Sequence, residues 1–133
     1  MSTRKLFIAD SLGLDDRKVG IMSDFIVYCT EKLPVRCDFE IHLIADRGDG
    51  KMTTGVYIVG DHVVKVYAKS RALADVMRSV AHEMTHMMQD ESGMITGPIQ
   101  DAGGFHEDQA NAKAGELLKT FARDTGDRSF YDL

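Results

Sequence analysis

Three stretches of the chain repeat apolar residues at intervals of three and four, the spacing that places side chains on one face of an α-helix. The first stretch covers 15–33, and Pro34 ends it. The second covers 70–90 and begins at Ser70, a suitable N-cap. The third covers 105–123. The pattern therefore predicts three amphipathic helices.

Between the first two helices the pattern changes to the alternation that is typical of β-strands. Apolar and polar residues alternate over 38–45, and 46–50 is rich in Gly and Asp, as turns are. Two further runs, 53–59 and 62–68, are separated by Gly60-Asp61. A two-residue connection that begins with Gly suits a type II′ hairpin. The sequence therefore predicts a small sheet of three strands.

The order of these elements predicts an α+β fold. An N-terminal helix comes first, followed by the three-stranded sheet with its hairpin and then by two helices. A loop over 93–104, which contains Pro98 and two adjacent glycines, joins the last two helices. We expect one domain that covers 1–133, because 133 residues with 44% hydrophobic residues can build one core without disulfides.

Charge and cysteine content limit the partners and the compartment. The formal net charge is -5, which argues against nucleic acid as the main partner. Cys29 and Cys37 have apolar neighbours, and the first residues contain no secretory signal. We therefore expect two reduced thiols in a cytoplasmic protein. No stretch of the sequence approaches the length of a transmembrane helix, so we expect no membrane contact.

The segment His82-Glu83-Met84-Thr85-His86 is an HExxH motif within the second predicted helix. Residues four apart lie on the same face of a helix, so both imidazoles can bind one metal ion. Glu83 lies about 100° further round the helix. There it can contact a water bound to that metal and act as a general base. The motif therefore predicts a zinc site with His82 and His86 as ligands.

A catalytic zinc site needs a third protein ligand and one open position. The extended motif with a third His does not apply, because Gln89 and Ser92 occupy the positions of its Gly and its third His. Glu107 is favoured, because it opens the third predicted helix after a loop long enough to reverse the chain. Asn111 lies one turn further and can orient a metal-bound His. The remaining candidates for the third ligand are Asp90, Glu91, Asp101, His106 and Asp108.

This arrangement resembles two groups of zinc peptidases. An HExxH motif followed about twenty residues later by a helix with a Glu ligand is similar to the glutamate-zincin pattern. The string from Glu107 to Asn111, EDQAN, together with Ala114 and Leu117-Leu118, resembles the corresponding helix of the ImmA/IrrE-like metallopeptidases. Those are compact intracellular or phage- and mobile-element-associated proteins. The resemblance covers 70–121 and implies a minimal zincin-like fold, a zinc cofactor and Glu107 as third ligand.

Asn111 departs from the glutamate-zincin pattern, in which an Asp often stands at this position and orients a zinc-bound His. A neutral amide raises the basicity of that His less, which implies weaker metal binding. A hydrogen-bond donor beside the zinc must also stabilise the transition state. His106 is the first candidate for this catalytic donor, because it is adjacent to Glu107. The others are Tyr57, Tyr67, His62 and Arg78.

These residues predict a zinc-dependent peptidase that hydrolyses peptide bonds with a metal-activated water and with Glu83 as general base. The alternative is a non-catalytic zinc-binding regulatory or interaction module that retains the fold. A purely structural zinc site is disfavoured, because such sites are rich in Cys and neither cysteine is near the motif. We expect a protein or peptide substrate that binds as an added strand along one strand of the hairpin, which favours flexible segments.

Overall fold

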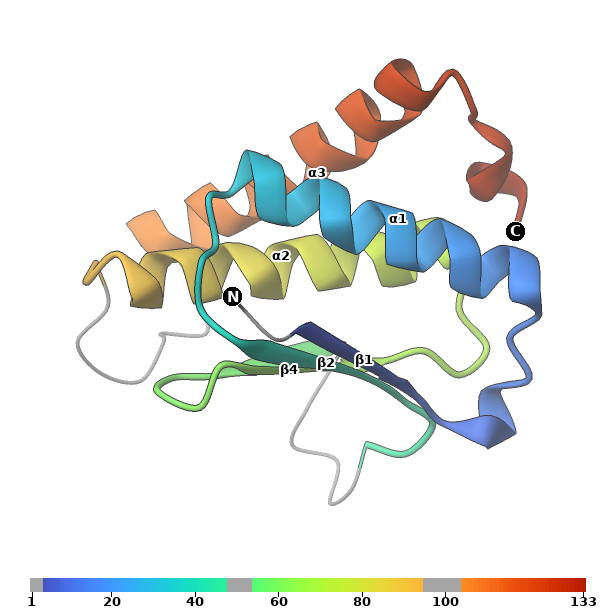
Figure 1. Ribbon diagram of the computed structural model, residues 1–133, viewed down its shortest axis with the longest axis horizontal. Helices are drawn as coiled ribbons and strands as arrows, with labels where there is room; N and C mark the ends of the chain where they lie inside the picture. Colours follow the sequence, from blue (N-terminus) through green and yellow to red (C-terminus); the bar gives the residue numbers. More distant parts are fainter. Residues whose placement is uncertain (1–3, 48–53, 95–103) are drawn as a thin grey trace.

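The computed structural model describes residues 4–47, 54–94 and 104–133. This part of the chain forms a four-stranded sheet with three long helices on one face (Figure 1). The elements, in chain order, are β1 (Arg4–Ile8), a 3-10 turn (Asp10–Leu12), α1 (Asp16–Lys32), β2 (Phe39–Ile44), β3 (Gly55–Ile58), β4 (Val63–Tyr67), α2 (Leu73–Glu91), α3 (Phe105–Thr125) and a second 3-10 turn (Ser129–Asp132). The predicted α+β class is confirmed.

The sheet has four strands rather than the predicted three, in the order β1-β2-β4-β3. β1 and β4 both pair parallel with β2, and β3 pairs antiparallel with β4. The pattern did not predict β1, because its five residues are all exposed or half-buried and show no clear apolar face. β1 joins the sheet only after the chain has crossed over through α1, as parallel pairing requires. Within the described residues, β3 forms the opposite edge of the sheet.

The predicted hairpin forms between β3 and β4, but its turn is longer than predicted. Ile58 and Val63 are the last paired residues, so four residues, 59–62, connect the strands. The two-residue type II′ turn at Gly60-Asp61 is therefore wrong. Gly60 and His62 have φ angles of 87° and 54°. These two residues have the left-handed backbone conformation, which reverses the chain over this longer connection.

The three helices agree with the predicted ones apart from their ends. Asp15 caps α1, because its carboxylate accepts a hydrogen bond of 2.9 Å from the backbone N–H of Lys18. The prediction of Ser70 as the N-cap of α2 is wrong. Ser70 has a φ angle of 57°, and the N-cap is Ala72, which has no capping side chain. α2 therefore depends on tertiary packing more than on its cap.

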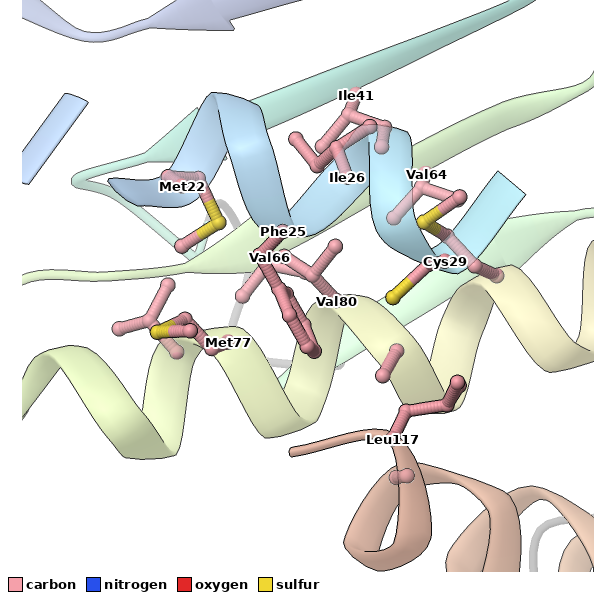
Figure 2. Packing of buried hydrophobic residues seen from close by; sticks show 14 of the residues in the cluster. Met22, Phe25, Ile26, Cys29, Ile41, Val64, Val66, Met77, Val80 and Leu117 are labelled. Atoms are coloured by element: carbon pink, nitrogen blue, oxygen red, sulfur yellow. The ribbon is translucent and has the colours of Figure 1, made fainter. Parts of the chain in front are cut away.

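α2 lies at the centre of the fold and contacts α1, α3, β3 and β4. Figure 2 shows how apolar side chains from the three helices, β2 and β4 meet in one cluster; the labelled residues are Met22, Phe25, Ile26, Cys29, Ile41, Val64, Val66, Met77, Val80 and Leu117. All of these residues are buried. α3 runs back along α2 after the connection between them (Figure 1). The packing therefore fixes the helix that carries the HExxH segment against both the sheet and α3.

Both cysteines are free thiols in the described part of the chain, as predicted. Cys29 lies in the core, where burial raises the pKa of its thiol, and Cys37 is half-buried. Across the described ranges, none of the helices combines the length and the apolar character that a membrane span requires. Parts of the predicted loops over 46–50 and 93–104, and the predicted strand start at Thr53, lie outside the described residues.

Candidate metal centre

His82, His86 and Glu107 converge where α2 packs against the start of α3. One ligand atom from each of these residues lies within 4.8 Å of the other two. The Nε2 atoms of the two histidines are 3.2 Å apart. Glu107 Oε1 is 3.2 Å from His82 Nε2 and 2.6 Å from His86 Nε2. The three residues that the sequence proposed as ligands are therefore brought together by the fold.

The spacing of these atoms is compatible with a single metal ion. Two ligand atoms about 2.0 Å from a tetrahedral zinc ion lie about 3.3 Å apart. Both distances from His82 Nε2 match this value. The 2.6 Å contact between His86 Nε2 and Glu107 Oε1 is shorter, and a bound zinc ion would require these two atoms to move apart by a fraction of an ångström. Two imidazoles and a carboxylate also form a usual donor set for catalytic zinc.

Glu83 lies beside this cluster in a dry environment. The residue is only 6% exposed, although it carries a carboxyl group. Burial is the main cause that raises its pKa to about 8, and the nearby Glu107 carboxylate raises it further. On the sheet side, Glu83 faces Gly55 of β3, where an added Cβ would lie 3.1 Å from Glu83 Cγ. The absence of a side chain at Gly55 therefore leaves room for the Glu83 carboxyl group.

Gln89 orients His86, whereas the sequence predicts Asn111 as the residue that orients a metal-bound His. His86 Nδ1 lies 2.8 Å from Gln89 Oε1, and Gln89 is fully buried. Asn111 is exposed, and the described residues include no hydrogen bond from it to either histidine. The prediction for Asn111 is therefore wrong. The i, i+3 spacing of His86 and Gln89 on one helix was the signal that could have identified this hydrogen bond.

Two of the other candidates for the third ligand have different partners. Asp90 Oδ2 accepts hydrogen bonds from the Tyr57 hydroxyl at 2.6 Å and from the Gly60 backbone N–H at 3.0 Å. Glu91 accepts from the backbone N–H of Arg36 at 2.9 Å. Both carboxylates thus attach the end of α2 to neighbouring segments and lie outside the cluster. Asp108 is exposed, and Asp101 lies outside the described residues.

His106 does not join the three clustered residues, among the groups that the structure describes. Its ring lies against Phe105, with 5.6 Å between the ring centroids, and its Nδ1 is a buried atom without a hydrogen-bond partner in the described ranges. The catalytic function of His106 stays a prediction.

The other candidate donors are placed as structural or surface residues. Tyr57 is buried and donates to Asp90, so its hydroxyl proton is already engaged. Burial and this bond to Asp90 raise the pKa of Tyr57. The guanidinium of Arg47 lies over the ring of Tyr67, with its Cζ atom 4.2 Å from the ring centroid. His62 belongs to the hairpin turn, and Arg78 is exposed on α2.

Comparison with known proteins identifies a related fold. No protein-family model matches the sequence, and no curated protein matches it. Two solved structures resemble this fold: a mutant of Wss1 from Saccharomyces cerevisiae, with a TM-score of 0.57, and Wss1 from the same organism, with a TM-score of 0.56. Each is 12% identical in sequence, and the alignments cover 93% of this chain and 94% and 93% of those chains, respectively.

At 12% identity this likeness concerns the fold alone. It agrees with the predicted α+β architecture of a small single unit. It does not extend to the glutamate-zincin type or to the ImmA/IrrE-like peptidases, so that resemblance stays a prediction. Within this fold, the His82, His86 and Glu107 cluster is a candidate metal centre.

Proposed function

We propose that this protein is a zinc-dependent peptidase, with His82, His86 and Glu107 as zinc ligands. The observation that carries the proposal is the convergence of these three side chains beside the buried carboxyl group of Glu83. Three ligands leave one position of a tetrahedral zinc ion open, as catalysis requires. A Glu ligand from a later helix also supports the glutamate-zincin type. Two free thiols suit a reducing compartment, which supports a cytoplasmic location.

The zinc ion and Glu83 would contribute different parts of the hydrolysis. A bound zinc ion would supply Lewis acidity, which polarises the scissile carbonyl and lowers the pKa of a bound water. Glu83 would accept the proton of that water and deliver it to the leaving amine. Burial raises the pKa of Glu83 in the metal-free site, and the positive charge of a bound zinc ion would lower it and favour the carboxylate form that a general base requires.

The outer edge of β3 is the proposed binding site for an extended peptide. The backbone N–H of Tyr67 donates to the carbonyl of Thr54 at 2.9 Å, and hydrogen-bonded pairs alternate along an antiparallel ladder. The backbone groups of Gly55 and Tyr57 therefore face away from β4. Gly55 lies next to Glu83, so a substrate strand paired at this edge would pass the catalytic residue. Such binding requires an extended segment and tolerates many sequences.

The zinc-loaded protein is expected to hydrolyse a reduced, unfolded protein, because only an extended chain can pair with β3. The measurement is the release of new amino termini over time. Treatment with a metal chelator should abolish the release, and zinc should restore it. The same substrate in its folded, disulfide-intact form serves as the control and should be cleaved far more slowly. Stoichiometric zinc binding without cleavage of any unfolded substrate would support the non-catalytic alternative.

Peptides with single N-methyl groups test the edge-strand proposal while the protein stays unchanged. N-methylation removes one backbone donor, as a proline does. Cleavage should slow by roughly fivefold at alternate positions, where the peptide N–H groups face β3, if each hydrogen bond contributes about 1 kcal/mol. Positions between them, where the N–H groups face away, are the internal control. An equal response at all positions would contradict pairing with β3.

A further inference from the structure

The Gln89 side chain connects the two helices that supply the proposed zinc ligands. It extends from α2, three residues after His86, and is fully buried. Its Oε1 lies 2.8 Å from His86 Nδ1. Its Nε2 donates to the backbone carbonyl of His106 at 3.0 Å and to Gln109 Oε1 at 2.8 Å. Every polar atom of this buried amide therefore has a partner, which is the condition for a buried polar group to be tolerated.

The partners of Gln89 fix which way its amide points. A backbone carbonyl can only accept a hydrogen bond, so the group that faces the carbonyl of His106 must be the NH2 of Gln89. The Oε1 atom then faces His86 and can only accept. His86 must therefore carry a proton on Nδ1. In the neutral ring, that proton leaves the Nε2 lone pair free, and Nε2 is the atom that points at His82 and Glu107.

The same amide holds the start of α3. The N-cap of α3, Gly104, has no capping side chain. His106 immediately precedes Glu107, so the bond from Gln89 to the His106 carbonyl fixes the backbone next to the third ligand. Gln109 provides a second attachment almost one turn after His106. The position of Glu107 relative to His86 thus depends on one side chain that touches neither carboxylate oxygen of Glu107.

We propose that Gln89 is a positioning residue that couples the two helices of the metal site: it presents His86 Nε2 to zinc and places Glu107 for binding to the same ion. This inference rests on the proposed function. Coupling by Gln89 predicts how the free energy of zinc binding changes when its amide is lost. Loss of the amide should weaken the contribution of Glu107 as well as that of His86, although Gln89 has no direct contact with zinc.

Gln89→Met tests this proposal, because Met has a similar length and forms none of the three hydrogen bonds. Its zinc affinity, measured by competition with a chelator, should fall by roughly 10–100-fold, the usual cost of removing a hydrogen-bond partner of a metal-bound His. The absorption of the cobalt-loaded protein should also change, since it reports the coordination geometry. Met87→Leu, a similar change at a buried position two residues earlier, should leave both measurements unaltered.

A double-mutant cycle separates the two contributions of Gln89. If Gln89 positions Glu107, the loss caused by Gln89→Met should be much smaller in a Glu107→Ala background. Additive losses would overturn the coupling. Equal zinc affinity of the wild type and Gln89→Met would overturn the whole inference but leave the proposed function standing. A wild type that binds no zinc would overturn both.

Gln89→Glu serves as a second variant if Gln89→Met does not fold, as judged by circular dichroism of the zinc-free protein. An ionised carboxylate still accepts from His86 Nδ1 but cannot donate to the carbonyl of His106. The zinc affinity of this variant should therefore depend less on Glu107 than that of the wild type. An undiminished effect of Glu107→Ala in this background would overturn the coupling.

Discussion

Glu83→Gln should bind zinc like the wild type and lose at least ~100-fold of its peptidase turnover, the usual scale for removal of a general base. The amide has nearly the same shape as the carboxyl group, so it fits the space left by Gly55. It cannot accept the proton of the attacking water. Because Glu83 is not one of the three clustered ligands, zinc content should stay at about one equivalent per chain. Turnover and zinc content are measured on the same preparation.

Glu91→Gln is the matched control for this substitution. Glu91 is on the same helix, but it is exposed and bonds to the backbone of Arg36 at the far end of α2. Its turnover should equal that of the wild type. Retention of turnover in Glu83→Gln would remove Glu83 from the mechanism. A simultaneous loss of zinc would instead indicate that Glu83 supports the ligands, and the two results are distinguished by metal analysis alone.

The fold could be predicted wherever local periodicity and burial coincide. α1 and α2 each carry a continuous apolar face that packs in the core, and the alternation in β2 matches its buried residues Phe39, Ile41 and Leu43. β1 could not be predicted in this way. Its residues are exposed or half-buried, and its pairing with β2 spans the whole of α1. Long-range parallel pairing leaves no signal in a short window of sequence.

The metal site was predictable to the extent that helix geometry determines it. The i, i+4 spacing of His82 and His86 places both on one face, and the fold brings Glu107 to that face. The residue that orients a metal-bound His was predicted on α3, but the structure has it on α2. The position of Asn111 one turn after Glu107 favoured it, whereas Gln89 reaches His86 within α2. Which of two polar side chains is buried depends on how α3 packs on α2, and sequence spacing alone does not specify that packing.

The His82→Ala, His86→Ala double variant should retain no measurable stoichiometric zinc, whereas the wild type should contain about one equivalent per chain. The two imidazoles supply two of the three proposed ligand atoms, and their Nε2 atoms lie 3.2 Å apart. Glu107 is then the one proposed ligand that remains, and a single carboxylate binds zinc weakly in water. The measurement is metal analysis after dialysis, with the fold of each variant checked by circular dichroism.

Single substitutions at adjacent positions of α3 then identify the third ligand. Glu107→Ala should release zinc far more readily than His106→Ala in a chelator competition, because Glu107 Oε1 contacts both histidines and the His106 ring lies outside the cluster. His106→Ala is the matched control, since its backbone carbonyl can still accept from Gln89. The turnover of His106→Ala separately tests the predicted catalytic donor, which requires a loss of activity with zinc retained.

If His106→Ala loses zinc while Glu107→Ala retains it, the third ligand has been assigned one residue too far along α3. Full zinc occupancy in the double His variant would show that the metal binds elsewhere.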